Sequence, residues 1–236
     1  MYKLFLTMTL FISLSAFAGK NEIKCLPGDS PSELPSEYLN GCETMDYFVS
    51  CIKIIGSGAS SSEITSCKNI KNTFALGCVH TLGSSIEPSE INYCAKIDNF
   101  YSYMSVKKVG SSASTSVINS ISKISNDLQY SCVDIMKSSA DSAKVEKCLD
   151  INNEYAFSAI KVIGRNIDST ELSRASQITT KEGAECVGII GASADSAEIS
   201  ACSSINNEFE LACVRVLGSG ADYYEISACN FPDTSY

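Results

Sequence analysis

The sequence of 236 residues contains one histidine, His80, and only three arginines. A single histidine leaves the chain without a conventional Ser–His or Cys–His pair for nucleophilic catalysis. The chain also lacks the C-x2-C pairs of zinc sites, a GK[ST] phosphate loop and a D-x-D-x-D calcium loop. We therefore expect no catalytic residues, no metal and no cofactor, and His80 is predicted to be a plain surface residue.

Positive charge is also scarce, because 18 Lys and Arg stand against 27 Asp and Glu and the net charge is −9. Binding to nucleic acid or to anionic lipid needs clustered basic residues. A chain this acidic is therefore poorly suited to bind nucleic acid or anionic lipid, and the expected partner is a protein. Beyond the N-terminal segment, no stretch approaches the ~18 apolar residues of a membrane-spanning helix.

The N-terminal segment, residues 1–18, has the composition of a secretory signal peptide. A short positive region containing Lys3 precedes an apolar run from Leu4 to Ser15, and Ala16-Phe17-Ala18 matches an A-x-A cleavage site. The sequence therefore predicts cleavage after Ala18 and a secreted or periplasmic protein.

What the chain does have is twelve cysteines and a repeat of 27 residues. Cysteine occupies positions 1 and 17 of most units, and the units start at residues 51, 78, 105, 132, 159, 186 and 213. An even number of cysteines in an exported chain is typical of disulfides.

Two units decide how the cysteines pair. The unit that starts at 105 has Ser105 and Ile121 at the two positions, and the unit that starts at 159 has Ala159 and Ala175. Only pairing within a unit leaves no cysteine without a partner. That scheme predicts six disulfides: Cys25–Cys42, Cys51–Cys67, Cys78–Cys94, Cys132–Cys148, Cys186–Cys202 and Cys213–Cys229.

Each unit is predicted to form two short helices. Asparagine recurs at position 22, where it would cap a first helix such as Glu208–Leu217. Glycine recurs at position 6, where it would end that helix in a left-handed conformation, with Lys137 as the exception. An Asp or Ser at position 10, with Glu three residues later, is a capping box for the second helix.

These signals predict an all-α fold, an α/α solenoid of about seven helical-hairpin repeats. The pattern resembles stacked helical hairpins such as TPR or HEAT arrays in general. The unit is shorter than theirs and lacks their signature residues, so the resemblance implies no particular function.

Three parts are expected along the chain. A signal peptide over 1–18 precedes a degenerate capping repeat over 19–50 and a repeat array over 51–236. The capping repeat contains Cys25, Cys42 and three prolines, and an atypical terminal repeat is what a solenoid needs.

Two groups of residues are candidates for binding. Position 3 is mostly basic, which indicates either favourable placement against the helix dipole or a ridge that binds an anionic partner; its residues are Lys53, Lys107, Lys161 and Arg215. The second group lies near the unit that starts at 159, which is either a hinge or a contact site; its residues are Arg165, Arg174, Lys181 and Glu185.

The sequence therefore favours an exported, disulfide-stapled helical-repeat protein that acts as a protein-binding or scaffold module. A secreted effector or inhibitor is an alternative with the same architecture. A hydrolase that acts on envelope material through acidic residues is the other alternative. The oligomeric state stays open.

Overall fold

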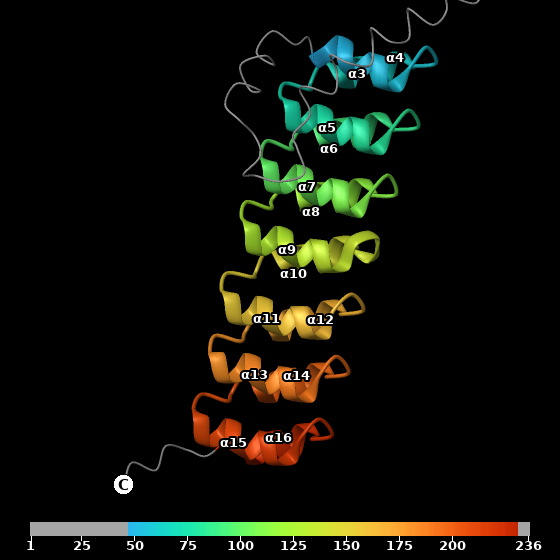
Figure 1. Ribbon diagram of the computed structural model, residues 1–236. Helices are drawn as coiled ribbons and strands as arrows, with labels where there is room; N and C mark the ends of the chain where they lie inside the picture. The colour runs from blue at the N-terminus through green and yellow to red at the C-terminus, as the bar shows by residue number, and fades with distance from the viewer. Residues whose placement is uncertain (1–46, 231–236) are drawn as a thin grey trace, which may run out of the picture. The chain divides into compact units, whose positions relative to one another are not determined.

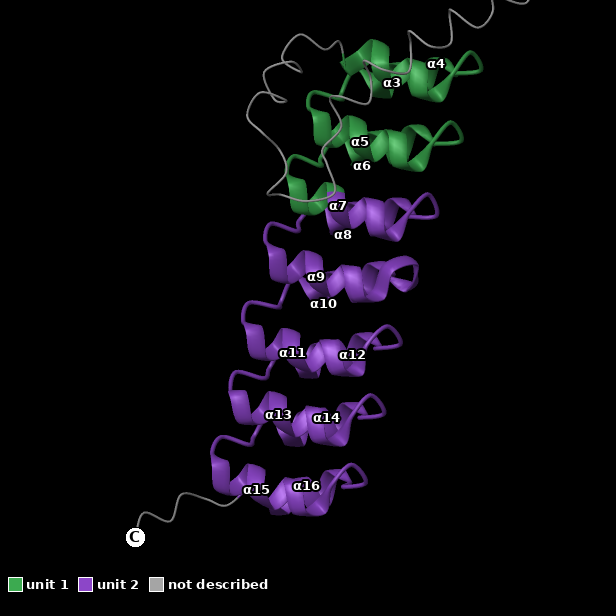
Figure 2. Cartoon of the chain, viewed as in Figure 1, with its two compact units in different colours: residues 1–103 green, residues 104–236 purple. Residues whose placement is uncertain are grey.

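The computed structural model describes residues 47–230, in which helices joined by short turns are the regular structure and no strand occurs (Figure 1). The predicted signal peptide, most of the capping repeat and the predicted Cys25–Cys42 disulfide lie outside the described residues. The chain forms two compact units, residues 1–103 and 104–236, and the boundary falls within one helix (Figure 2).

The helices follow one another in a regular order. Unit 1 contains α3 (Tyr47–Ile55), α4 (Ser61–Cys67), α5 (Thr73–Leu82), α6 (Pro88–Cys94) and the start of α7 (Phe100–Val109). Unit 2 contains the rest of α7, α8 (Thr115–Ile121), α9 (Asp127–Met136), η3 (Lys137–Ser139), α10 (Ser142–Cys148), α11 (Glu154–Ile163), α12 (Ser169–Ala175), α13 (Lys181–Ile190), α14 (Ser196–Cys202), α15 (Glu208–Leu217) and α16 (Tyr223–Ala228).

Odd-numbered helices, called first helices here, alternate with shorter even-numbered second helices. In unit 2, first helices contact the next first helix, as α11 contacts α13, and second helices contact the next second helix, as α12 contacts α14. Unit 1 repeats the arrangement with α3 against α5 and α4 against α6. Each unit is therefore a set of helix pairs packed side by side.

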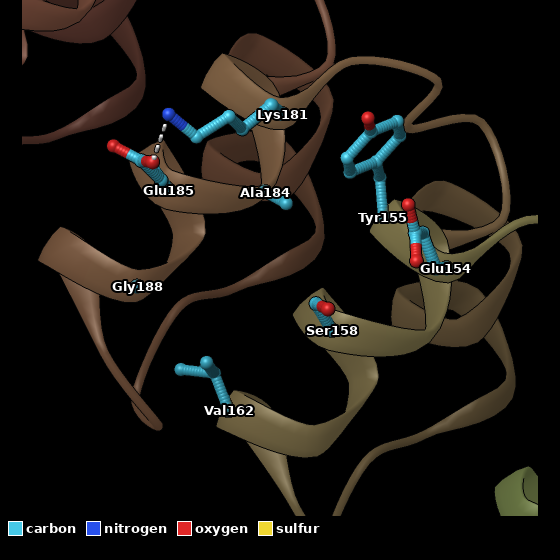
Figure 3. Close-up of a pocket in the computed structure, with 8 residues that line it drawn as sticks. All are labelled: Glu154, Tyr155, Ser158, Val162, Lys181, Ala184, Glu185 and Gly188. Atoms are coloured by element: carbon cyan, nitrogen blue, oxygen red, sulfur yellow. Dashed lines mark ion pairs between the residues drawn. The ribbon is translucent and has the colours of Figure 1, made fainter.

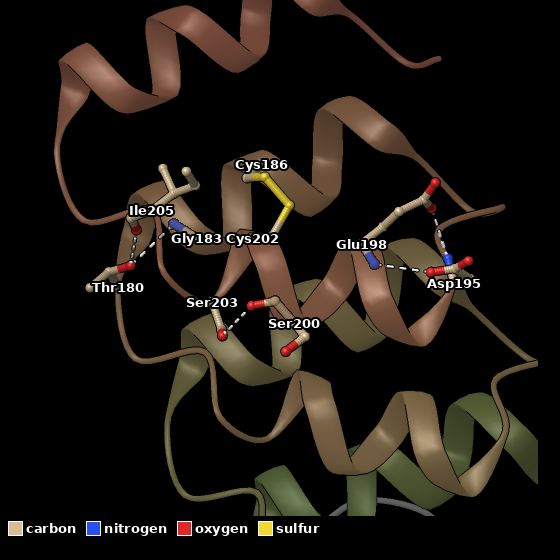
Figure 4. The surroundings of a disulfide bond; sticks show 9 residues. All are labelled: Thr180, Gly183, Cys186, Asp195, Glu198, Ser200, Cys202, Ser203 and Ile205. Atoms are coloured by element: carbon tan, nitrogen blue, oxygen red, sulfur yellow. Dashed lines mark hydrogen bonds between the residues drawn. A yellow bond between two sulfur atoms is a disulfide. The ribbon is translucent and has the colours of Figure 1, made fainter. Parts of the chain in front are cut away.

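The helices begin where the capping residues predict. Asn153 and Asn207 accept hydrogen bonds from backbone N–H groups in the first turns of α11 and α15, and Thr180 does the same for α13. Most second helices begin with capping boxes, such as the one between Asp195 and Glu198 at α14 (Figure 4). The exceptions are α8 and α10, which have an N-cap side chain without the box. These local bonds satisfy backbone donors that a helix terminus leaves unpaired.

Each pair buries a stripe of branched apolar side chains between its helices. From α5 onward, the first helices bury a valine or isoleucine next to the cysteine position: Val79, Val106, Val133, Ile160, Val187 and Val214. A buried isoleucine follows each second helix from α4 to α14: Ile70, Ile97, Ile124, Ile151, Ile178 and Ile205. These side chains form the core that holds the two helices of a pair together.

Five disulfides join the first and second helices of their pairs: Cys51–Cys67, Cys78–Cys94, Cys132–Cys148, Cys186–Cys202 and Cys213–Cys229. They are the pairs within one 27-residue repeat that the sequence predicts, and their Cα–Cα distances run from 5.4 to 5.7 Å. So many structural disulfides fit a protein of an oxidising compartment, outside the cytoplasm.

First helices end at a residue with positive φ, which is glycine in every pair except one. The glycines are Gly56, Gly83, Gly110, Gly164, Gly191 and Gly218. Lys137 takes their place after α9 with φ of 53°, and it is the only non-glycine residue with positive φ among the described residues. A side chain with a Cβ is strained in this conformation.

Replacing Lys137 with glycine should therefore raise the free energy of unfolding by about 1 kcal/mol. Urea unfolding followed by far-UV circular dichroism measures the change. Gly164→Ala is the matched control, because no atom within 4 Å except a backbone oxygen at that limit faces an added Cβ there. It should lower stability by a similar amount, and a neutral Lys137→Gly would show that the lysine is not strained.

Candidate functional site

A shallow hollow of about 370 Å³ lies on the exposed side of α11 and α13 in unit 2 (Figure 3). Its lining residues are Glu154, Tyr155, Ser158, Val162, Lys181, Ala184, Glu185 and Gly188. Small side chains create it. Ala184 and Gly188 occupy positions in α13 where α11 has Phe157 and Lys161. The surface is therefore recessed between the two helices.

One side of the hollow combines an aromatic ring with a carboxylate. Tyr155 is half-buried, and Glu154 beside it is exposed at the first residue of α11. Within residues 47–230, the Glu154 carboxylate has no hydrogen-bond or ion-pair partner. The Glu154 carboxylate is therefore available to a ligand, next to an aromatic surface.

The other side of the hollow holds a chain of ion pairs. Lys181 Nζ lies 3.1 Å from Glu185 Oε1, and Glu185 Oε2 lies 2.8 Å from an Arg215 guanidinium nitrogen. Arg215 also contacts Glu208 at 3.1 Å. These ion pairs link α13 to α15 and fix the position of the Glu185 carboxylate at the edge of the hollow.

The ion pairs also shift the protonation of Glu185. Hydrogen bonding to Lys181 holds the pKa of Glu185 below its ordinary value, and Arg215 adds to the effect. Since this pKa is lower in the folded than in the unfolded protein, the ion pairs stabilise the fold above the unfolded pKa. That stabilisation is lost as the pH falls through the folded pKa of Glu185.

We expect the Glu185 carboxyl signal in a carbon-13 NMR titration to show a midpoint below that of an ordinary glutamate. Lys181→Met should move the midpoint upward, because it removes the main hydrogen-bond donor. Lys161→Met is the matched control, since Lys161 is an exposed lysine outside the ion pairs. An unchanged midpoint in Lys181→Met would contradict the assignment.

Packing explains why α13 has a glycine, Gly183, in its first turn. A Cβ on Gly183 would lie 3.0 Å from the carbonyl oxygen of Cys202. Thr180 accepts a hydrogen bond from the Gly183 N–H at 3.1 Å and donates one to the carbonyl of Ile205 at 2.9 Å (Figure 4). The missing side chain at Gly183 thus lets α13 pack closely on the end of α14.

Of the second candidate group, the structure brings Lys181 and Glu185 together, and Arg215 from the predicted basic ridge joins them. It does not bring the other two arginines into the same chain of ion pairs. Arg165 follows α11 and donates a hydrogen bond to Ser138 at 3.1 Å. Arg174 is exposed on α12.

The predicted basic ridge is less positive than its lysines suggest. Lys53 in unit 1, and Lys107 and Lys161 in unit 2, are exposed on first helices. In unit 2, however, α9 has Asp134 at the equivalent position. Arg215 lies between two carboxylates, which offset its charge.

Sequence reasoning missed the residues of α11 that line the hollow, above all Glu154 and Tyr155. Their repeat positions often hold acidic and aromatic residues in other first helices, so they look ordinary. The available signal was Gly188, which stands where most units have a basic residue. A missing side chain on an exposed helix surface leaves room for a ligand.

A second exposed surface, on α15 and α16, is apolar. On α15 and α16, Phe209, Val216 and Tyr224 are 86%, 87% and 79% exposed. The positions of Phe209 and Val216 correspond to Tyr155 and Val162 in α11, which are half-buried where α13 packs on α11. No described helix packs on this side of the last pair, and among the described residues nothing shows what would cover this surface.

Within residues 47–230, no helix is long and apolar enough to cross a membrane. The same residues contain no group of three or more His, Cys, Asp or Glu that could hold a metal ion. No protein-family model matches the chain, and neither a curated protein nor a solved structure shows significant similarity to it.

Proposed function

We propose that the chain is an exported α/α solenoid that binds another protein along the exposed surface of its first helices. In this proposal the signal peptide over 1–18 directs export and is cleaved after Ala18. About seven 27-residue repeats follow an N-terminal capping repeat. Repeats that contact only their neighbours present an extended, ordered surface, and such surfaces commonly bind proteins.

The observation that carries the proposal is the hollow between α11 and α13. It lies on the exposed side of first helices and combines apolar lining with the unpaired carboxylate of Glu154. Sites that recognise ligands typically have an apolar lining with a few fixed polar groups. The disulfides in the neighbouring pairs support it, because they hold those pairs in one arrangement.

Site-specific photo-crosslinking in the exported fraction of the native host tests this proposal. A photoreactive amino acid would replace Ser158 or Gly188 in the hollow, and, as matched controls, Thr170 or Ala197 on second helices. All four positions are exposed. We expect protein adducts from the two hollow positions and not from the controls. No adduct at the hollow, or equal adducts on both surfaces, would contradict the proposal.

A further inference from the structure

We infer that the hollow between α11 and α13 binds a basic side chain, arginine or lysine, presented by a segment of the partner protein. This inference rests on the proposed function and names the chemistry that the site selects. It depends on the shape of the hollow, on the charges around it and on the aromatic ring at its side.

The shape suits one side chain rather than an enclosed small molecule. The hollow is shallow and open to solvent, and Val162, Ala184 and the ring of Tyr155 give it apolar lining (Figure 3). The methylene groups of a lysine or arginine can lie along such a surface while the charged end stays at the rim. Ser158 and Gly188 leave space for that end to pass.

The charges favour a cation over an anion. Glu154 has no partner within the described residues, whereas the one positive group in the lining, Lys181, is already paired with Glu185. A basic side chain would therefore gain an ion pair with Glu154. An acidic side chain would face Glu154 and Glu185 without a free cation in the lining. The net charge of −9 further favours a basic partner.

The ring of Tyr155 adds a second interaction that favours a cation. A cation near the face of a tyrosine is attracted by the ring quadrupole, whose face is negative. The chain already contains this arrangement elsewhere, where Lys96 Nζ lies 4.3 Å from the ring centroid of Tyr93. A carboxylate and an aromatic ring on neighbouring residues together recognise a basic group that also has an apolar stem.

The test uses the full chain with its disulfides intact and three blocked tetrapeptides, acetyl-Gly-Leu-Xaa-Gly-amide. Xaa is arginine, its neutral analogue citrulline, or glutamate. Titrations followed by nitrogen-15 NMR locate the binding site and give dissociation constants. We expect the arginine peptide to shift amide signals of α11 and α13, and to bind about fivefold or more tightly than the citrulline peptide. Raising the salt concentration should weaken the binding of the arginine peptide.

Two variants test the residues named. Glu154→Gln and Tyr155→Leu should each raise the dissociation constant of the arginine peptide by about threefold or more. Leucine is tolerated at that repeat position, because α9 has Leu128 there. Asp127→Asn is the matched control, since it removes a carboxylate from the first residue of α9, away from the hollow, and should leave binding unchanged.

The outcomes separate this inference from the proposed function. Equal binding of the arginine and citrulline peptides, preference for the glutamate peptide, or no effect of Glu154→Gln would overturn the basic side chain as the ligand. Photo-crosslinks from Ser158 and Gly188 would then still support protein binding at the hollow. If Ser158 and Gly188 give no crosslinks while the rest of the lining is natural, the proposed function itself is overturned.

Discussion

Truncating Ile160 to alanine should lower the free energy of unfolding by about 2 to 5 kcal/mol. Ile160 is fully buried in α11, so its removal loses apolar contacts and leaves a cavity. Its helix pair has Ala159 and Ala175 where five of the described pairs have a disulfide. No disulfide therefore limits the separation of α11 from α12 once the core between them is weakened.

Urea unfolding measures the loss, and amide hydrogen exchange shows whether α11 and α12 open before the rest of unit 2. Val162→Ala is the matched control, because Val162 lies on the same helix but is only half-buried. It should cost less than about 1 kcal/mol. Similar losses in both variants would mean that the buried stripe of α11 does not hold the pair together.

Introducing cysteine at both Ala159 and Ala175 should raise the free energy of unfolding by about 3 kcal/mol. The two alanines are fully buried at the repeat positions of the natural disulfides. In the five disulfides the same positions bring the Cα atoms to 5.4–5.7 Å, which suits a disulfide without backbone movement. The new bond would restrict the unfolded chain over a loop of the same length.

Thiol titration of the double variant, unfolded in denaturant without reductant, should detect no free thiol, and urea unfolding should show the gain. The control is Ala159→Cys alone, which adds the same buried sulfur without a partner and should bring no comparable gain. Two thiols that stay free in the folded double variant would show that α11 and α12 lie further apart than the helices of the other pairs.

The sequence predicted the local features of the fold with accuracy. It predicted the boundaries of α15, Glu208 to Leu217, and the structure has the same boundaries. It predicted the left-handed position of Lys137 from the glycines at the same place in other units. These features depend on a few neighbouring residues, and the repeat presents the same pattern several times.

The disulfides were predictable for a related reason. Cysteines at positions 1 and 17 are lost in pairs, so the units that lack them show which residues are partners. The five pairs within the described residues have this connectivity. The sixth predicted pair, Cys25–Cys42, stays a prediction.

The candidate site was predictable only in part. Two residues of the second candidate group, Lys181 and Glu185, meet in the structure, and Arg215 from the predicted basic ridge joins them. Arg165 and Arg174 were predicted in the same group and do not join them. Proximity in the sequence could not distinguish the two cases, since Glu185 and Arg215 are 30 residues apart.

By itself the sequence determined the helix pairs, because caps, glycines and buried positions act within one 27-residue unit. The tertiary structure decided where a ligand could bind. The hollow exists because Ser158 and Val162 on α11 lie opposite Ala184 and Gly188 on α13 (Figure 3). Its depth and charge depend on which side chains two neighbouring helix pairs bring side by side. That packing is not a property of either repeat alone.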